Sequence, residues 1–227
     1  MSIIEFFRAG GIVMYPLLLI SLGAVAIMVE RFLAYRQLAD TAPDLVQEST
    51  RMVRAGRHAE ALRLAESRQG PVAAAVATVL RNRGESASHL ESRVAEVIGE
   101  YELRLERFLP FLDTATTLSP LLGLLGTIIG MVSVFQRFQG AGADEAAKQA
   151  ILGGVGEALY ATATGIFVAV VCFAAYNYFA ARVKNTLQET EVAATKVINA
   201  MNEATPAAGV PAAASVAPAA GAVPVRR

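Results

Sequence analysis

Among the polar side chains inside long apolar stretches of this 227-residue chain, five could take part in chemistry. Two are acids, Asp113 and Glu157, and three are threonines, Thr127, Thr162 and Thr164. An ionisable group within a membrane span is costly, so it usually faces a water-filled cavity or a partner. Threonine does not titrate near neutral pH, but its hydroxyl can order water or bond a carboxyl group. These residues therefore indicate an ion path, whose obligate acid could sit on another chain.

Helical spacing gathers these polar residues on particular faces. Asp113 and Thr127 share one face of a helix, and Glu157 and Thr164 share a face of the next apolar segment, with Thr162 on the adjoining face. Several threonines on facing helices favour a hydrated seam, although a lone threonine is usually satisfied by its own backbone carbonyl. For the two acids, the alternative is an interfacial side chain that reaches the headgroups or caps a helix end.

Small residues recur where helices could approach each other closely. Gly126 and Gly130 form a small-xxx-small pair with Gly123 nearby, and Gly165 belongs to a similar series in the next apolar segment. Such series allow close helix packing in lipid. Three thin spans cannot enclose a pore by themselves, so we expect a homo-oligomer.

Three segments are long and apolar enough to span a bilayer, which takes roughly 20 residues. They cover residues 12–29, 111–135 and 151–179. The first could instead be a signal peptide, because a basic residue precedes it and small residues near its end mimic a cleavage site. Its apolar run continues past those small residues to Glu30 and Arg31, as a stop-transfer flank would. We therefore expect a retained span.

Basic residues set the expected orientation. Twelve lysines and arginines lie in residues 30–110 and five follow residue 179, against one before the first span and two between the second and third. Cytoplasmic loops carry such an excess, so we expect a multi-pass protein of the bacterial inner membrane with a cytoplasmic C-terminus. The other expected regions are a periplasmic N-terminus (1–11), a cytoplasmic helical segment (30–110), a short periplasmic loop (136–150), a cytoplasmic helical extension (180–203) and a disordered Ala/Pro-rich tail (204–227).

The predicted fold is an all-α integral membrane protein with three transmembrane helices and long helical extensions into the cytoplasm. Ser88 followed by Glu91 fits a capping box, and apolar residues then recur at helical spacing. The pattern contains no turn signal before the second span. It therefore predicts one continuous helix from Ser88 into the membrane.

Several function classes are disfavoured by composition. Formal net charge is zero, whereas a nucleic-acid binder would be expected to carry a basic excess. The single cysteine cannot form an internal disulfide, and neither histidine lies in a predicted span. The sequence contains no phosphate loop, no paired metal ligands and no nucleophile elbow. We expect no enzymatic activity, no metal and no cofactor.

Three motifs resemble the ExbB/TolQ/MotA proton channel family, and ExbB most of all. The first-span motif covers residues 10–17 and 29–31, the second-span motif 119–131, and the third-span motif 156–165 with 175–177. The resemblance implies a pentamer around a single-span ExbD- or TolR-like partner, whose membrane aspartate carries the proton.

The same resemblance implies roles for individual residues. Thr127 and Thr162 match the family's two pore threonines, and Glu157 matches its third-span glutamate. An ExbB-type subunit would couple the proton motive force to a TonB-like transducer and outer-membrane transport. A TolQ-type subunit, which would serve envelope integrity and cell division, remains the alternative within the family. A non-conducting membrane scaffold is the alternative outside it.

Overall fold

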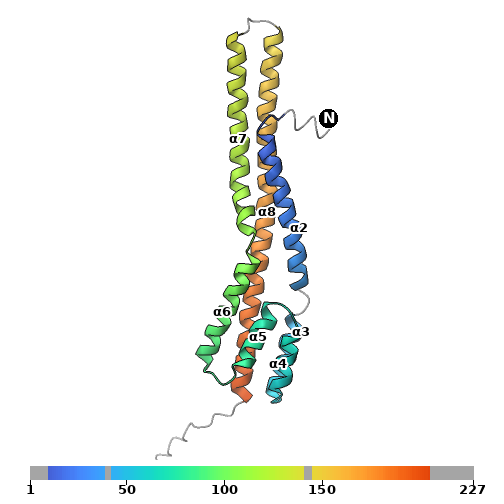
Figure 1. Ribbon diagram of the computed structural model, residues 1–227, viewed down its shortest axis with the longest axis vertical. Coiled ribbons are helices and arrows are strands. Elements are labelled where there is room, and N and C mark those ends of the chain that lie inside the picture. Colours follow the sequence, from blue (N-terminus) through green and yellow to red (C-terminus); the bar gives the residue numbers. More distant parts are fainter. Residues whose placement is uncertain (1–9, 39–41, 141–144, 205–227) are drawn as a thin grey trace, which may run out of the picture.

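The computed structural model of the protein describes residues 10–38, 42–140 and 145–204, and the regular elements in these ranges are helices (Figure 1). In chain order they are α2 (Met14–Leu38), α3 (Ala42–Arg54), α4 (His58–Glu66), α5 (Pro71–Arg81), α6 (Ala87–Leu105), α7 (Leu109–Gly140) and α8 (Glu145–Ala204). The prediction of an all-helical fold is confirmed. The expectations for residues 1–9, for the middle of the 136–150 loop and for the tail after residue 204 lie outside the described ranges.

Among the described residues, three helices are long and apolar enough to cross a membrane: α2, α7 and α8. α7 and α8 each contain a predicted span, and α2 covers the first one from Met14 onward. The glycines near the start of the third span leave the helix unbroken, because α8 begins before them at Glu145. α8 has 60 residues, and at 1.5 Å per residue it is about 90 Å long. It therefore runs far beyond the thickness of a bilayer.

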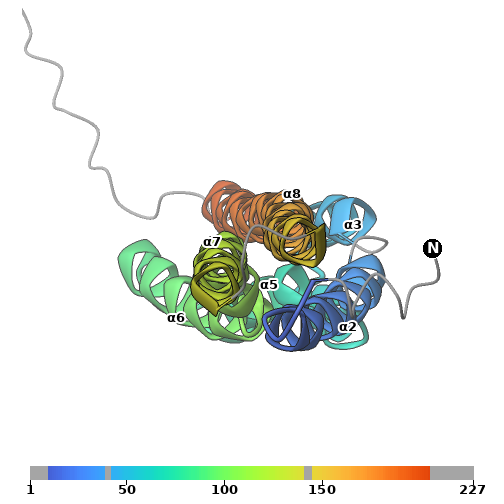
Figure 2. The ribbon, with the colours of Figure 1, turned by 90° about the horizontal axis from the view of Figure 1, so that it is seen from above.

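The long helices lie side by side. Seen along the long axis of the molecule, α7 and α8 are adjacent and α2 lies next to both (Figure 2). The outer ends of α7 and α8 extend beyond the first turn of α2 (Figure 1). The short helices α3, α4 and α5, together with α6, gather around the other half of α8. One helix thus belongs to both halves of the molecule.

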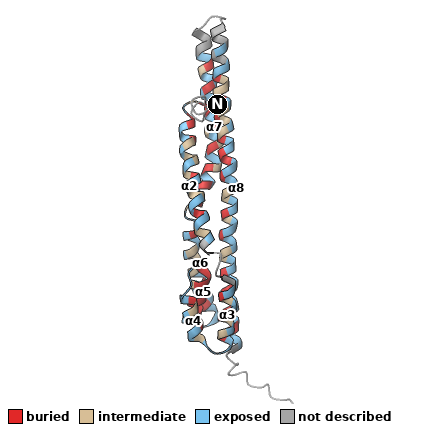
Figure 3. Ribbon diagram, turned by 90° about the vertical axis from the view of Figure 1, so that its right-hand side faces the viewer, coloured by how far each residue is buried: buried red, intermediate tan, exposed pale blue. Residues whose placement is uncertain are grey.

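The bundle around the C-terminal half of α8, called its distal half below, has a continuous apolar core, shown by the buried residues in Figure 3. α5 lies at its centre, with Val76 and Val79 fully buried. Gly70 precedes this helix with a φ of 118°, which favours glycine, and Pro71 occupies its first turn, where a proline costs no hydrogen bond. α8 contributes Val197 and Ile198 to the same core.

The prediction of one continuous helix from Ser88 into the membrane is wrong. α6 ends at Leu105, and α7 begins at Leu109. Pro110 explains the break, because proline has no backbone N–H and its ring clashes with the preceding helical turn. The start of α6 also differs from the prediction: Ser86, not Ser88, is the N-cap, and its hydroxyl accepts a hydrogen bond from the backbone N–H of His89 at 3.4 Å.

Candidate functional site

The packing of α7 on α8 is made by small residues. A Cβ atom added to Gly126 would lie 2.5 Å from the Cβ of Ala161, and one added to Gly130 would lie 2.9 Å from the Cβ of Ala158. A Cβ added to Gly165 would lie 2.5 Å from the backbone oxygen of Ser119. Any side chain at these glycines would separate the helices. We call this contact the α7–α8 seam.

Thr162 connects the two helices across the seam. Its hydroxyl donates a hydrogen bond to the backbone carbonyl of Gly123 at 3.0 Å. The contact requires glycine, since a Cβ at position 123 would lie 3.0 Å from the Cα of Thr162. This threonine therefore does more than satisfy its own helix, which is the usual role of a lone threonine in a span.

Thr127 and Glu157 lie close to the level of Thr162. Thr127 follows Gly126, which contacts Ala161, and it is one turn from Gly123, about 6 Å along the helix axis. Its hydroxyl donates to the carbonyl of Leu124 in its own helix at 2.7 Å. Thr127, Glu157 and Thr162 are all half-buried. Thr127, Glu157 and Thr162 thus lie within about two helical turns of one another along the α7–α8 pair, and Thr162 bonds across the seam.

The carboxyl group of Glu157 packs against the start of α2. It occupies the place where a Cβ on Gly11 would lie. Gly11 has a φ of 71°, in the left-handed region that favours glycine. Glu157 therefore contacts the segment leading into the first span, which is far from it in the sequence.

Of the other two predicted site residues, Asp113 lies at a different level, and Thr164 lies near Thr162 but bonds only within its own helix. Asp113 is exposed near the start of α7, about 21 Å from Thr127 along the helix axis. Thr164 is half-buried, and its hydroxyl donates to the carbonyl of Tyr160 in its own helix at 2.8 Å. The structure therefore places four of the five polar residues at neighbouring levels of the α7–α8 pair and leaves Asp113 apart.

Ser119 is a further polar residue of the seam, and the sequence patterns do not single it out as a candidate site residue. Its side chain is fully buried, and among the described residues its hydroxyl has no hydrogen-bond partner. A signal was present, because Ser119 stands on the same helical face as Gly123 and Gly126. A buried hydroxyl without a partner costs free energy, so this position differs from an ordinary packing contact.

The fold and the seam define a class of protein. Long apolar helices expose large side chains such as Leu121, Ile128 and Phe167, while the hydroxyl of Thr162 bonds from one helix to the next and a carboxyl group lies at a neighbouring level. Such an arrangement is typical of a multi-pass membrane protein with a polar path between helices.

Comparisons with known proteins specify the family. A family model described as the MotA/TolQ/ExbB proton channel family matches residues 58–192. An ExbB-like biopolymer transport protein of Synechocystis sp. is 35% identical over 173 residues, which cover 75% of this chain and 81% of the relative. The chain belongs to the MotA/TolQ/ExbB proton channel family.

Two further relatives lie on different branches. An ExbB homologue of Methanothermobacter thermautotrophicus is 27% identical over 84% of this chain and 67% of the relative. The Tol-Pal system protein TolQ of Haemophilus influenzae is 40% identical, but over 85 residues, which are 37% of this chain and 36% of the relative. The resemblance to the family inferred from the sequence motifs is thus confirmed, with relatives of both names.

Proposed function

We propose that this chain is the multi-span subunit of a proton channel in the bacterial inner membrane, with α7 and α8 lining the proton path. The observation that supports this most is the polar level of the seam, where the hydroxyl of Thr162 bonds across to Gly123. Thr127 and Glu157 lie close to this level on the same helix pair. Asp113 would stand near the cytoplasmic mouth of the path, and Thr164 would flank it.

A second chain would complete the path. Threonine hydroxyls order water but do not release a proton near neutral pH, so an acid must carry it. A single-span ExbD- or TolR-like partner would supply that acid. The chain itself would form a homo-oligomer, most simply a pentamer, in which exposed apolar faces of α2, α7 and α8 meet lipid or neighbouring subunits. The N-terminus would be periplasmic, and α3–α6 with the distal half of α8 cytoplasmic.

The work done by the channel would be to couple the proton motive force to a TonB-like transducer and outer-membrane transport. Relatives named ExbB that cover most of the chain favour this role. The alternative is a TolQ-type subunit for envelope integrity and cell division. It is favoured by the identity of 40% to a TolQ protein, which is higher over its 85 residues than the 33% over 99 residues to an ExbB protein of Xanthomonas campestris.

Valine substitutions test the proposed path. Thr127→Val and Thr162→Val keep the shape of the side chain and remove its hydroxyl, so both should abolish proton flux through the channel with its partner while the complex still assembles. Thr114→Val is the matched control, because Thr114 is exposed on α7 and bonds its own helix at the carbonyl of Pro110. Normal flux in both seam variants would refute these assignments, and no flux in the wild-type complex would favour a non-conducting scaffold.

A deletion strain separates the two roles. Growth failure on iron-starved medium alone would place the chain with ExbB-type uptake. Growth failure on detergent alone would place it with TolQ-type envelope maintenance. Normal growth on both would contradict both roles unless a second gene copy is present, which deletion of any paralogue would reveal.

A further inference from the structure

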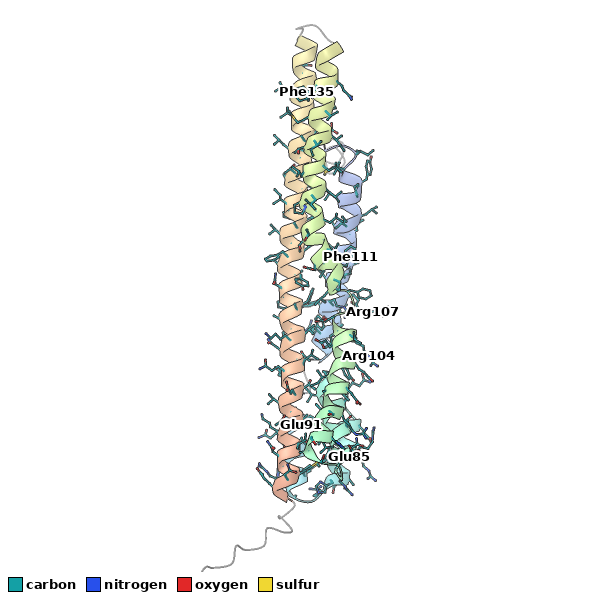
Figure 4. All side chains as sticks on the ribbon, turned by 90° about the vertical axis from the view of Figure 1, so that its left-hand side faces the viewer. Glu85, Glu91, Arg104, Arg107, Phe111 and Phe135 are labelled. Atoms are coloured by element: carbon teal, nitrogen blue, oxygen red, sulfur yellow. The ribbon has the colours of Figure 1, made fainter. Side chains whose placement is uncertain are left out.

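The break between α6 and α7 leaves backbone carbonyls without their helical partners. In a continuous helix the carbonyl of Leu105 would accept from the N–H of Leu109, but that N–H donates to Glu106 instead at 2.9 Å. Figure 4 shows Arg104 below the break and Phe111 above it, on the two helices that meet there. Carbonyls at a helix end need other donors when they are buried.

Side chains of α2 supply these donors. The Nη1 atom of Arg31 donates to the carbonyls of Arg104 and Leu105, at 3.2 and 3.1 Å. The hydroxyl of Tyr35 donates to the same carbonyl of Leu105 at 2.7 Å. The guanidinium also lies 5.1 Å from the ring centroid of Phe108, a residue within the break itself. α2 therefore holds the end of α6 and contacts Phe108 within the break.

Arg31 is buried and charge-paired in this position. Its residue is 6% exposed. Its Nε and Nη2 atoms donate to the two carboxylate oxygens of Glu30, at 2.5 and 2.8 Å. A planar guanidinium has three nitrogens that donate hydrogen bonds. Two of them bond the carboxylate, the third bonds two carbonyls, and the flat group lies over a ring at the same time. Lysine, with one nitrogen, cannot replace it.

We propose that Arg31 is a positioning residue of the channel, which clamps the α6–α7 break and so holds α7 in place against α8. This inference rests on the proposed role of α7 in the proton path. Two helices joined without a continuous hydrogen-bond ladder can bend at the joint. A bend there would move α7, with Thr127, relative to the Thr162 side of the seam. The clamp makes the first span responsible for the geometry of the path, although α2 contributes none of the polar seam residues.

The test compares Arg31→Lys with Arg36→Lys in the complete complex with its partner. Arg36 is the matched control because it is exposed on the same helix. Two quantities are measured: proton flux per assembled complex in liposomes, and hydrogen–deuterium exchange of a peptide covering residues 102–112. A peptide covering residues 72–80, in the core around α5, reports on general loosening.

Arg31→Lys should lower flux per assembled complex and accelerate exchange at 102–112 by about tenfold, while exchange at 72–80 stays at the wild-type rate. Arg36→Lys should change neither quantity. Tyr35→Phe removes one hydrogen bond to Leu105 and should give a smaller change in the same direction, and it keeps the test open if Arg31→Lys fails to assemble.

Wild-type flux and wild-type exchange at 102–112 in the Arg31→Lys and Tyr35→Phe complexes would overturn the clamp. Faster exchange of both peptides with unchanged flux per assembled complex would also overturn it, because that result describes a purely structural residue. Absence of flux in the wild-type complex would instead count against the proposed function. Faster exchange confined to 102–112 would then still support the clamp at the break.

Discussion

The two halves of the molecule are held together by different means. Around the distal half of α8, valine, alanine and leucine side chains fill a closed core between several helices. At the other end, α7 and α8 meet through glycines and a threonine, and large apolar side chains point outward. The first half buries its apolar surface within one chain. The second half leaves that surface exposed, which is the pattern expected of helices packed in a bilayer.

Substitutions in the two halves should differ in whether they affect stability alone or function as well. A protein whose closed core loses a methyl group can remain folded at lower stability. In a seam of close backbone contacts, an added atom clashes and pushes the helices apart. We therefore expect substitutions in the bundle to change stability, and substitutions in the seam to change the proton path as well. Four predictions test this difference, in order of decreasing effect on stability.

Leu80→Ala should have the largest effect on stability. Leu80 is 3% exposed in α5, and removing a buried leucine side chain costs about 2–4 kcal/mol through lost burial and the cavity left behind. Denaturant unfolding of the purified complex measures the loss, with Val192→Ala as the control because Val192 is 46% exposed. Flux per assembled complex should stay near the wild-type value. A loss of flux in fully assembled Leu80→Ala complex would show that the two halves are not separate in function.

Gly165→Ala should destabilise the seam by about 1–3 kcal/mol, the usual cost of overpacking. The added methyl group would lie 2.5 Å from the backbone oxygen of Ser119, which cannot rotate away. Unlike the previous variant, this one should also reduce flux per assembled complex. Unchanged flux and unchanged stability would mean that α7 and α8 can move apart at Gly165 without affecting the fold or the proton path.

Gly99→Ala should have the opposite sign. Gly99 lies inside α6, and an added Cβ would meet no atom within 4 Å. Alanine in a helix interior is more stable than glycine by roughly 0.5–1 kcal/mol. The midpoint of unfolding should therefore rise, and flux should not change. A fall in stability at Gly99 similar to that at Gly165 would remove the contrast between the two halves.

The ion pair of Glu85 and Arg93 should have the smallest effect. The hydrogen bond from the Arg93 guanidinium lowers the pKa of the Glu85 carboxyl below its ordinary value. A lowered folded-state pKa adds stability above the unfolded-state pKa, and this stability is lost as the pH falls through the folded-state pKa. Arg93→Gln should thus slightly lower the unfolding midpoint at neutral pH, with no difference from wild type in strong acid. A difference that persists in strong acid would mean that Arg93 acts through packing.

Much of the membrane half could be predicted because its determinants are local. Apolar runs of sufficient length specify the helices α2, α7 and α8, and the spacing of Gly126 and Gly130 indicates a close-packed face. The family motifs lie in the same stretches. Helical periodicity likewise placed Thr127 on α7 and Thr162 on α8, although it could not show that Thr162 bonds to Gly123.

The errors and omissions have physical reasons as well. Apolar periodicity does not predict the break before α7, because the periodicity continues across it. Pro110 is the sequence signal that the helix itself cannot continue. The N-cap was assigned to Ser88 because a glutamate follows it at the capping-box spacing, whereas Ser86 caps the helix. The contacts of Arg31 with the break join residues more than 70 positions apart, and no local pattern encodes them.

We propose that the polar level of the α7–α8 seam forms part of a proton path. The most direct measurement is proton flux into liposomes containing the chain with its single-span partner, compared between Thr162→Ser and Thr162→Val. Serine keeps a hydroxyl that can reach the carbonyl of Gly123, and valine keeps only the shape. We expect flux with serine and none with valine at equal assembly. Equal flux in the two variants would contradict it.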